Sequence, residues 1–215
     1  MRRSDRHSAA RRAVDLMVAT LGVAVLCPVM LAHALAVRLR MGSPVLFRQQ
    51  RSGKDGVEFT IVKLRTMRDE RAPGEADAER TPRLGHLLRS TSLDELPQLW
   101  NVLRGDMSLI GPRPTLPEQV ARYGPYERRR LEVVPGLTGW AQVNGRNSLT
   151  WPERIDLDIW YIDHRSVLLD LRILARTLAR LLRPHGVTGV GGVNPGFPGP
   201  GEQSGPSSPP GRAPG

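Results

Sequence analysis

The clearest hydrophobic pattern in the chain is a long apolar run near its N-terminus. Between residues 14 and 37 the only acidic or basic side chains are Asp15 and His33. A run of about 20 apolar residues has the length of a transmembrane helix. It is too long for the apolar region of a signal peptide, and no small-residue cleavage site follows it. The pattern therefore predicts a membrane segment that is retained in the protein.

Basic residues flank this run on both sides: Arg2, Arg3, Arg6, Arg11 and Arg12 before it, and Arg38, Arg40, Arg48, Arg51 and Lys54 after it. Basic flanks favour the cytoplasm, so two of them fit a hairpin that enters one leaflet and returns. Pro28 removes a helix hydrogen bond near the middle of the run, which favours a kink there. A single-pass helix with a tolerated proline fits the same residues, and both interpretations stay open at this point.

The rest of the pattern predicts a small α+β domain. Residues 44–50 and 57–65 are typical of two strands around a turn at 53–56. In the second strand Lys63 and Arg65 are two residues apart and project from one face. Such a pair is typical of a solvated strand edge, and it also suits a diphosphate.

Helices and loops alternate through the remaining chain. The pattern predicts helices at 82–89, from about 93 to 103, at 118–134 with a break at Gly124-Pro125, and at 166–183. It predicts a loop at 68–81 and turn-rich connections at 105–117 and 135–147. The last helix carries a leucine stripe beside an arginine stripe, which suits an anionic membrane surface or a core-packing helix with a solvated basic face.

Composition narrows the choice of partner. The formal net charge is +10, the pI is near 11.1, and only 5% of residues are aromatic. A strong basic excess favours an anionic partner such as nucleic acid, acidic lipid or a phosphorylated substrate. The chain has no zinc-finger spacing and no aromatic residues interleaved with Lys and Arg, which argues against nucleic acid. Cys27 is the only cysteine, so an intrachain disulfide and a cysteine metal cluster are excluded.

Candidate chemistry centres on the adjacent carboxylates Asp94 and Glu95. In isolation such a pair is more often structural: Ser92 and Glu95 have capping-box spacing, and Asp94 is an alternative N-cap ahead of Pro97. A helix N-terminus also keeps a carboxylate ionised and holds a phosphate near it. A carboxylate that attacks phosphorus forms an acyl phosphate, and Mg²⁺ binds through one or two carboxylates plus substrate phosphates.

Two downstream segments add donors for an anionic ligand. Prolines on both sides of Arg113 restrict the backbone, so its guanidinium binds a phosphate at little ordering cost. Within the turn-rich segment 135–147, Gln142, Asn144 and Arg146 are candidate donors to a nucleotide or a sugar.

The order and spacing of these motifs resemble the small monotopic phosphoglycosyl transferases of bacterial glycan assembly. The likeness runs from Arg12 to about Val187. It is carried by the apolar segment with Asp15 and Pro28, Lys-Leu-Arg-Thr-Met at 63–67, Ser-Leu-Asp-Glu-Leu at 92–96, Gly-Asp-Met-Ser at 105–108, Gly-Pro-Arg-Pro at 111–114, Gly-Trp-Ala-Gln-Val-Asn-Gly-Arg-Asn at 139–147, and Leu157-Asp158 with Tyr161.

The resemblance implies a monotopic protein of the cytoplasmic membrane with its catalytic domain on the cytoplasmic face. The apolar segment is then a re-entrant helix hairpin broken at Pro28, where Cys27 stands in place of the serine that close relatives often carry. The implied organisation is a basic arm at 1–12, a re-entrant membrane helix at 13–40, a cytosolic catalytic domain at 41–187 and a disordered Gly/Pro-rich tail at 188–215. Interfacial amphipathic helices complete the implied α+β fold.

The resemblance also implies the reaction and its residues. A UDP-sugar donates a phospho-sugar to polyprenyl (undecaprenyl) phosphate, releasing UMP and initiating exopolysaccharide, O-antigen or glycoprotein glycan assembly. Asp94 is the implied nucleophile, and Glu95 assists with Mg²⁺ and positioning, so both are implied metal ligands. The implied substrate contacts are Lys63, Arg65, Arg89, Arg113, Gln142, Asn144, Arg146 and Asp158.

The implied partners are the UDP-sugar, the polyprenyl phosphate and an anionic membrane surface, with no nucleic acid, while a homo-oligomer stays open. Two other functions compete with this one. The first is direct displacement without a covalent intermediate, and the second is a non-catalytic basic adaptor at the membrane surface. The sequence does not identify the sugar.

Overall fold

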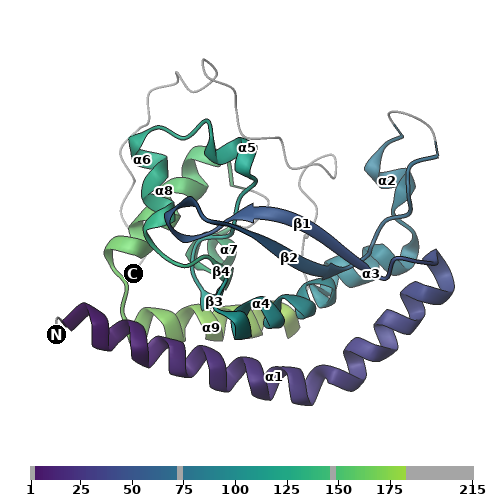
Figure 1. The fold of residues 1–215 in the computed structure, drawn as a ribbon, viewed down its shortest axis with the longest axis horizontal. Coiled ribbons are helices and arrows are strands. Elements are labelled where there is room, and N and C mark those ends of the chain that lie inside the picture. The colour runs from purple at the N-terminus through teal and green to yellow at the C-terminus, as the bar shows by residue number, and fades with distance from the viewer. Residues whose placement is uncertain (1–2, 72–74, 146–148, 183–215) are drawn as a thin grey trace.

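The computed structural model describes residues 3–71, 75–145 and 149–182. Within those residues, one long helix lies along one side of a small body made of short helices and two-stranded sheets (Figure 1). The predicted α+β class is therefore confirmed. The predicted tail at 188–215 lies outside the described residues.

The long helix is α1 (Arg3–Met41), which contains the whole apolar run. It is continuous, with Pro28 inside it, and Figure 1 shows it bent toward the body. An interior proline removes a backbone hydrogen bond and crowds the preceding turn, which bends a helix. The segment Ala9–Met41 is long and apolar enough to cross a membrane by length and composition. The predicted basic arm belongs to this same helix from Arg3 onward.

The first half of α1 is fastened to the body by polar contacts at its start. The Arg12 guanidinium donates hydrogen bonds to the carbonyls of Val102 and Leu103, at the end of α4 (Leu99–Arg104). Asp15 is buried and accepts a hydrogen bond from the backbone N–H of Leu109 at 3.0 Å. These bonds add partners for two carbonyls at the end of a helix and for a strand N–H.

The predicted β-hairpin is confirmed. Strands β1 (Leu46–Ser52) and β2 (Glu58–Leu64) pair antiparallel. The turn between them contains the short 3₁₀ helix η1 (Lys54–Gly56), in which Asp55 and Gly56 have φ values of 56° and 78°. Aspartate and glycine tolerate this left-handed conformation, which reverses the chain over few residues.

The helix predicted from 93 to 103 is two elements. After α3 (Arg83–Thr91), Ser92 adopts a left-handed conformation with φ of 59°. The 3₁₀ helix η2 (Leu93–Gln98) follows and then continues as α4. Neither predicted side-chain cap is present at the start of η2. Proline lacks an N–H and so cannot make an interior α-helical hydrogen bond, which accounts for the 3₁₀ start that contains Pro97.

The connections predicted to be irregular contain a parallel strand pair, β3 (Ser108–Ile110) and β4 (Gly136–Thr138). The backbones beyond β3 approach so closely that a Cβ on Gly136 would lie 2.0 Å from the nitrogen of Gly111. Glycine at this point is therefore a steric requirement. Between the two strands, the helix predicted at 118–134 is three short helices, α5 (Pro117–Val120), α6 (Pro125–Arg128) and η3 (Arg129–Glu132).

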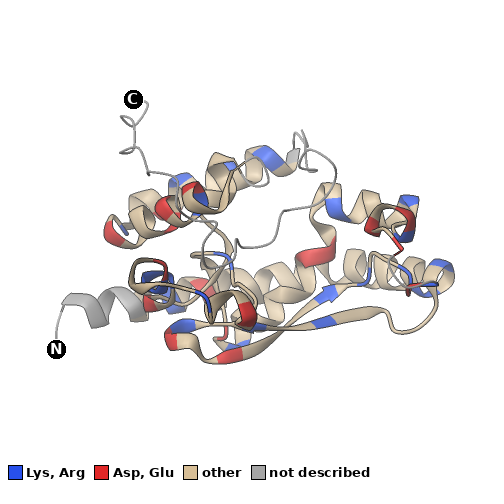
Figure 2. Cartoon of the chain, turned by 90° about the horizontal axis from the view of Figure 1, so that it is seen from above, with Lys and Arg blue, Asp and Glu red and all other residues tan. Residues whose placement is uncertain are grey.

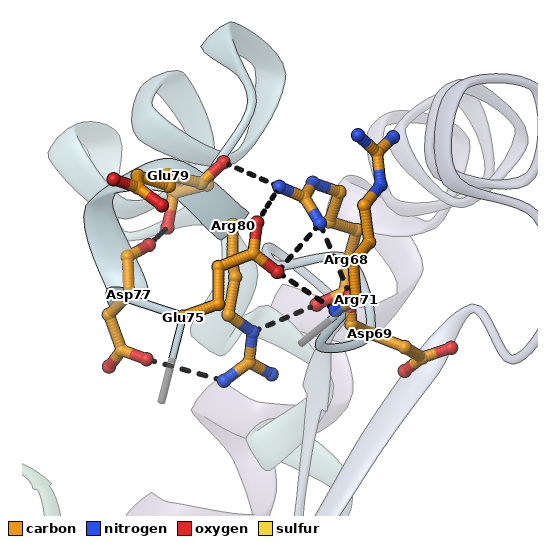
Figure 3. A network of polar contacts seen from close by, with 8 residues as sticks. Arg68, Asp69, Arg71, Glu75, Asp77, Glu79 and Arg80 are labelled. Atoms are coloured by element: carbon orange, nitrogen blue, oxygen red, sulfur yellow. Dashed lines mark hydrogen bonds and ion pairs between the residues drawn. The ribbon is translucent and has the colours of Figure 1, made fainter. Parts of the chain in front are cut away.

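The loop predicted at 68–81 contains a short helix, α2 (Asp77–Arg80), and closes on itself. The backbone N–H of Arg68 donates to the carbonyl of Arg80 at 2.9 Å, and the Arg80 guanidinium donates back to the Arg68 carbonyl at 3.3 Å. Figure 3 shows Arg68 also ion-paired with Glu75. The two ends of the segment between β2 and α3 are therefore held together.

Three helices end the described chain: α7 (Trp140–Asn144), α8 (Trp151–Asp163) and α9 (Val167–Leu182). Helix α8 was not among the predicted elements, although Thr150 and Glu153 form a capping box at its start. Helix α9 confirms the prediction at 166–183.

The leucine stripe of α9 faces outward. Leu171, Leu178 and Leu181 are 57%, 61% and 47% exposed, whereas Leu169 and Ile173 pack into the core. The first half of α1 also exposes large apolar side chains, including Met17 at 64% and Leu21 at 63%. Figure 2 shows acidic and basic residues interspersed over the body seen from above.

Candidate active site

The structure places two of the predicted site residues, Lys63 and Arg113, around Glu95. Glu95 lies in η2, which packs against β2. The Nζ of Lys63 in β2 is 2.7 Å from Glu95 Oε1, and Arg113 Nη2, from the segment after β3, is 2.6 Å from the same oxygen. The predicted cluster of two cations and the carboxylate pair is therefore assembled from three separate elements.

Asp94 differs from its neighbour because its carboxylate is unpaired. The residue is only 8% exposed, and it makes no hydrogen bond or ion pair with any residue the structure describes. Burial, and then the negative charge of Glu95, raises the pKa of Asp94 to about 6, against the opposing pull of Lys63, Arg113 and Arg89. The carboxylate is still mostly ionised at pH 7, but the expected effect of a helix N-terminus does not dominate.

Glu95 is held by cations at both oxygens. Burial alone would raise the pKa of Glu95, but Arg113 and Lys63 hold that pKa well below its usual range. Two adjacent carboxylates whose environments separate their pKa values are suited to different roles. Glu95 is a fixed anion that organises cations, and Asp94 is a carboxylate available to react.

The cations keep capacity for a ligand. The side chain of Arg113 is 40% exposed, so part of its guanidinium faces solvent. Glu95 raises the pKa of Arg113, whereas burial lowers the pKa of Lys63 despite its contact with Glu95. Lys63 and Arg113 share Glu95 and neither bonds to Asp94, so both cations keep donors for an anionic ligand.

Two other predicted cations, Arg89 and Arg65, differ in where their side chains point. Arg89 donates to the hydroxyl of Thr66 at 2.9 Å, and its charge acts on Asp94. Arg65 is turned away, because β2 ends at Leu64 and the Arg65 guanidinium donates to the carbonyls of Met67 and Ser43. The predicted same-face pairing of Lys63 and Arg65 therefore does not bring Arg65 to the carboxylates.

Two of the predicted donors, Gln142 and Asn144, lie in α7, whose start packs against Gly111. Gln142 has a buried side-chain amide without a hydrogen-bond partner among the described residues. Asn144 is exposed, donates to the Trp140 carbonyl and accepts from Arg176, each at 2.8 Å. Arg146 lies outside the described residues.

Asp158 lies behind the site. It is 1% exposed and pairs with Arg130 at 2.7 Å, and a second Arg130 nitrogen donates to the Tyr123 hydroxyl. Arg130 also donates to the backbone carbonyl of Arg113 at 3.1 Å. The geometry therefore offers Asp158 no direct contact with a surface ligand. It connects Asp158 to the backbone that carries Arg113.

Arg51 is a cation near the site that the sequence assigned only to the membrane flank. Its guanidinium reaches the carbonyl of Pro114 at 3.4 Å, next to Arg113. Burial, and then the nearby charge of Arg113, lowers the pKa of Arg51 to about 10. The hairpin register was the available signal, because alternation places Arg51 and Lys63 on one face.

The acidic residues of this site supply too few ligands to hold Mg²⁺ by themselves, so substrate phosphates would have to supply the others. The described residues contain no group of three or more His, Cys, Asp or Glu placed to hold a metal ion. Both oxygens of Glu95 contact cations, so Asp94 is the available carboxylate. Mg²⁺ commonly binds through one or two carboxylates, with waters and substrate phosphates as its other ligands.

Sequence comparison places this site among known proteins. Residues 6–184 match the family described as bacterial sugar transferase. An uncharacterized sugar transferase EpsL of Bacillus subtilis is 46% identical over 180 residues, covering 82% of this chain and 89% of the relative. A UDP-glucose:undecaprenyl-phosphate glucose-1-phosphate transferase of Caulobacter vibrioides is 44% identical, covering 80% of this chain and 69% of the relative.

A third relative carries a different sugar in its name. The UDP-N-acetylgalactosamine-undecaprenyl-phosphate N-acetylgalactosaminephosphotransferase of Aeromonas hydrophila is 38% identical over 187 residues, covering 82% of this chain but 44% of the relative. Relatives of similar identity therefore differ in the sugar they transfer.

Proposed function

Because the chain belongs to the bacterial sugar transferase family and is a phosphoglycosyl transferase, we propose that it transfers a sugar phosphate from a UDP-sugar to undecaprenyl phosphate, initiating glycan assembly. The observation that carries the proposal is the unpaired carboxylate of Asp94 beside a Glu95 that two cations hold. The family relationship leaves the non-catalytic adaptor without support.

The reaction takes two displacements at one phosphorus atom. In the first, an Asp94 oxygen bonds to the sugar-bearing phosphorus, the bond from that phosphorus to the bridging oxygen breaks, and UMP departs with the electron pair. In the second, an oxygen of undecaprenyl phosphate attacks the same phosphorus and the Asp94 carboxylate is released. The product is undecaprenyl diphosphate sugar. An unpaired, buried carboxylate suits the first step, since no bonded side chain of the protein must be displaced before it attacks.

The surrounding cations neutralise the phosphate that Asp94 attacks. Lys63 and the exposed part of Arg113 face the carboxylate pair, and Glu95 fixes both in place. Preorganised charge of this kind stabilises a transition state without reorganisation during the reaction. Asp94 is the carboxylate free to hold Mg²⁺ in concert with the donor phosphates, where the ion supplies additional charge neutralisation.

The placement of α1 supports a monotopic, re-entrant arrangement, and the basic residues on both flanks of the apolar run favour the cytoplasmic face. The start of the helix is fastened to the body through Arg12 and Asp15, and its end passes into β1 within a few residues. A spanning helix separates its ends by about 30 Å of hydrocarbon, which is incompatible with both ends joining one polar body. The exposed leucines of α9 and the apolar side chains of α1 supply surface for one leaflet.

Turnover with defined substrates tests this function. Full-length protein in detergent, with Mg²⁺ and undecaprenyl phosphate, is given UDP-glucose, UDP-galactose or UDP-N-acetylgalactosamine, and UMP is quantified. We expect one donor to be favoured and Asp94→Asn to lose at least about a thousandfold in rate.

Asp55→Asn is the matched control, because Asp55 lies in the hairpin turn in a left-handed conformation that asparagine also adopts. Its rate should stay within about twofold of wild type. Wild-type protein that releases no UMP with any donor would refute the proposed function, and an active Asp94→Asn variant would refute the role of Asp94.

A further inference from the structure

The β-hairpin carries Arg51 on the same face as Lys63. Residues paired across antiparallel strands share a face, and the pairs Phe47–Lys63, Gln49–Ile61 and Arg51–Phe59 alternate with pairs on the other face. Arg51 is four positions after Phe47, or roughly 13 Å along the strand. Lys63 and Arg51 therefore occupy the two ends of one face.

The end of β1 is joined to the segment that carries Arg113. The backbone N–H of Ser52 donates to the carbonyl of Thr115 at 2.9 Å, and Arg51 reaches the carbonyl of Pro114 at 3.4 Å. Arg51 thus extends the positive region of Lys63 and Arg113 toward the hairpin turn at the end of β1.

The charge of Arg51 is not matched by a bonded carboxylate. Its Nη2 donates to the side-chain oxygen of Gln49 at 2.6 Å, and its Nε is buried with no hydrogen-bond partner among the described residues. Glu95 is already shared by Lys63 and Arg113, and Glu118 acts on Arg51 only through its field. A buried guanidinium with an unused donor costs free energy unless an anion completes its contacts.

We propose that Arg51 binds the phosphate of the departing nucleotide, while Lys63 and Arg113 face the phosphate that Asp94 attacks. The assignment rests on the proposed function, in which the donor carries two phosphates joined by one oxygen. Two phosphates need two sets of donors, and the hairpin face supplies cations at both of its ends. The nucleotide side of the donor then lies toward the hairpin turn at the end of β1.

Binding of UMP alone tests the assignment, because UMP contains only the departing phosphate. Affinity is measured by titration calorimetry on the full chain in detergent with Mg²⁺, for wild type, Arg51→Gln, Arg51→Lys and Arg48→Gln. Arg48 is on the same strand but on the opposite face, and it is exposed. We expect Arg51→Gln to weaken UMP binding about tenfold or more, Arg51→Lys to give a smaller loss, and Arg48→Gln to leave the affinity unchanged.

A purely structural role for Arg51, as a clamp on Pro114, gives a different pattern. That role predicts a lower melting temperature and equal losses for UMP and for the KM of undecaprenyl phosphate. The proposal predicts an unchanged melting temperature and an unchanged KM for the lipid acceptor. Wild-type UMP affinity in Arg51→Gln, or parallel loss of both ligands, overturns it. Because wild-type turnover is measured in the same preparation, failure of the proposed function is recognised separately.

Discussion

Two clusters in this molecule pair an arginine with a carboxylate, and they differ in what they leave available. The accessible cluster consists of Lys63, Asp94, Glu95 and Arg113. The buried cluster consists of Tyr123, Arg130 and Asp158. In the buried cluster both charged side chains are 2% exposed, whereas the Arg113 side chain is 40% exposed. Arg113 connects the two, since its side chain belongs to the first and its carbonyl accepts a hydrogen bond from Arg130.

This difference indicates that the accessible cluster binds a ligand and that the buried cluster supports the fold. In the buried cluster Arg130 divides its donors among a carboxylate, a hydroxyl and a backbone carbonyl. In the accessible cluster Asp94 is unpaired and two cations share one glutamate. Buried ionic groups persist when they are fully paired, so incomplete pairing in a nearly buried carboxylate marks a place where a ligand completes the site.

Breaking the buried cluster should have the largest effect on stability. We expect Asp158→Asn to lower the free energy of unfolding by about 3–5 kcal/mol, because Arg130 is left as a buried charge without its counterion. Chemical denaturation in detergent measures the loss. Asp156→Asn, an exposed carboxylate on the same helix, should change stability by less than about 0.5 kcal/mol. Equal small effects of the two substitutions would show that the buried pair is not required.

An aspartate-to-asparagine substitution in the accessible cluster, Asp94→Asn, should raise the free energy of unfolding. The raised pKa of Asp94, about 6, means that ionising this buried carboxylate costs free energy as pH rises through that value. Asparagine does not ionise, so we expect Asp94→Asn to stabilise the protein at pH 7 by about 1–3 kcal/mol without Mg²⁺. The gain should disappear below about pH 4, where Asp94 is protonated in both folded and unfolded chains. Destabilisation at pH 7 would contradict the unpaired state of Asp94.

The acid limb of the pH profile sharpens the contrast between Asp94 and Glu95. Since the ionised form of Asp94 attacks, kcat/KM for the donor should fall about tenfold per unit below pH 6. Removing the negative charge of Glu95 lowers the pKa of Asp94, so Glu95→Gln should move this limb to lower pH while reducing the plateau. Initial UMP release across pH 4.5–8 measures both. A limb that stays in place in Glu95→Gln would argue that the two carboxylates do not interact.

The sequence predicted what depends on local pattern. Alternation and turn residues predicted the hairpin. The family resemblance implied Lys63 and Arg113 as substrate contacts, and the structure places both beside Glu95. The long-range partners were not readable. Asp158 is 28 residues from Arg130, and neither pattern nor propensity indicates that the two pair in the core.

Two further differences have local causes that only the folded chain reveals. Arg65 follows Lys63 in the motif but lies past the end of β2, so its side chain turns back to the start of β1. Arg51 lies far from the carboxylates in sequence, and only the strand register brings it near them. In each case the residue type was visible, while its direction depended on where a strand ends or pairs.

The central claim is that Asp94 becomes covalently phosphorylated by the donor. Intact mass spectrometry of the full chain, incubated with Mg²⁺ and a UDP-sugar but no lipid acceptor, tests it most directly. The account predicts an added mass of one sugar phosphate on wild type, one equivalent of released UMP, and no adduct on Asp94→Asn. No adduct with any donor, combined with product once undecaprenyl phosphate is supplied, would contradict the covalent step and establish direct displacement.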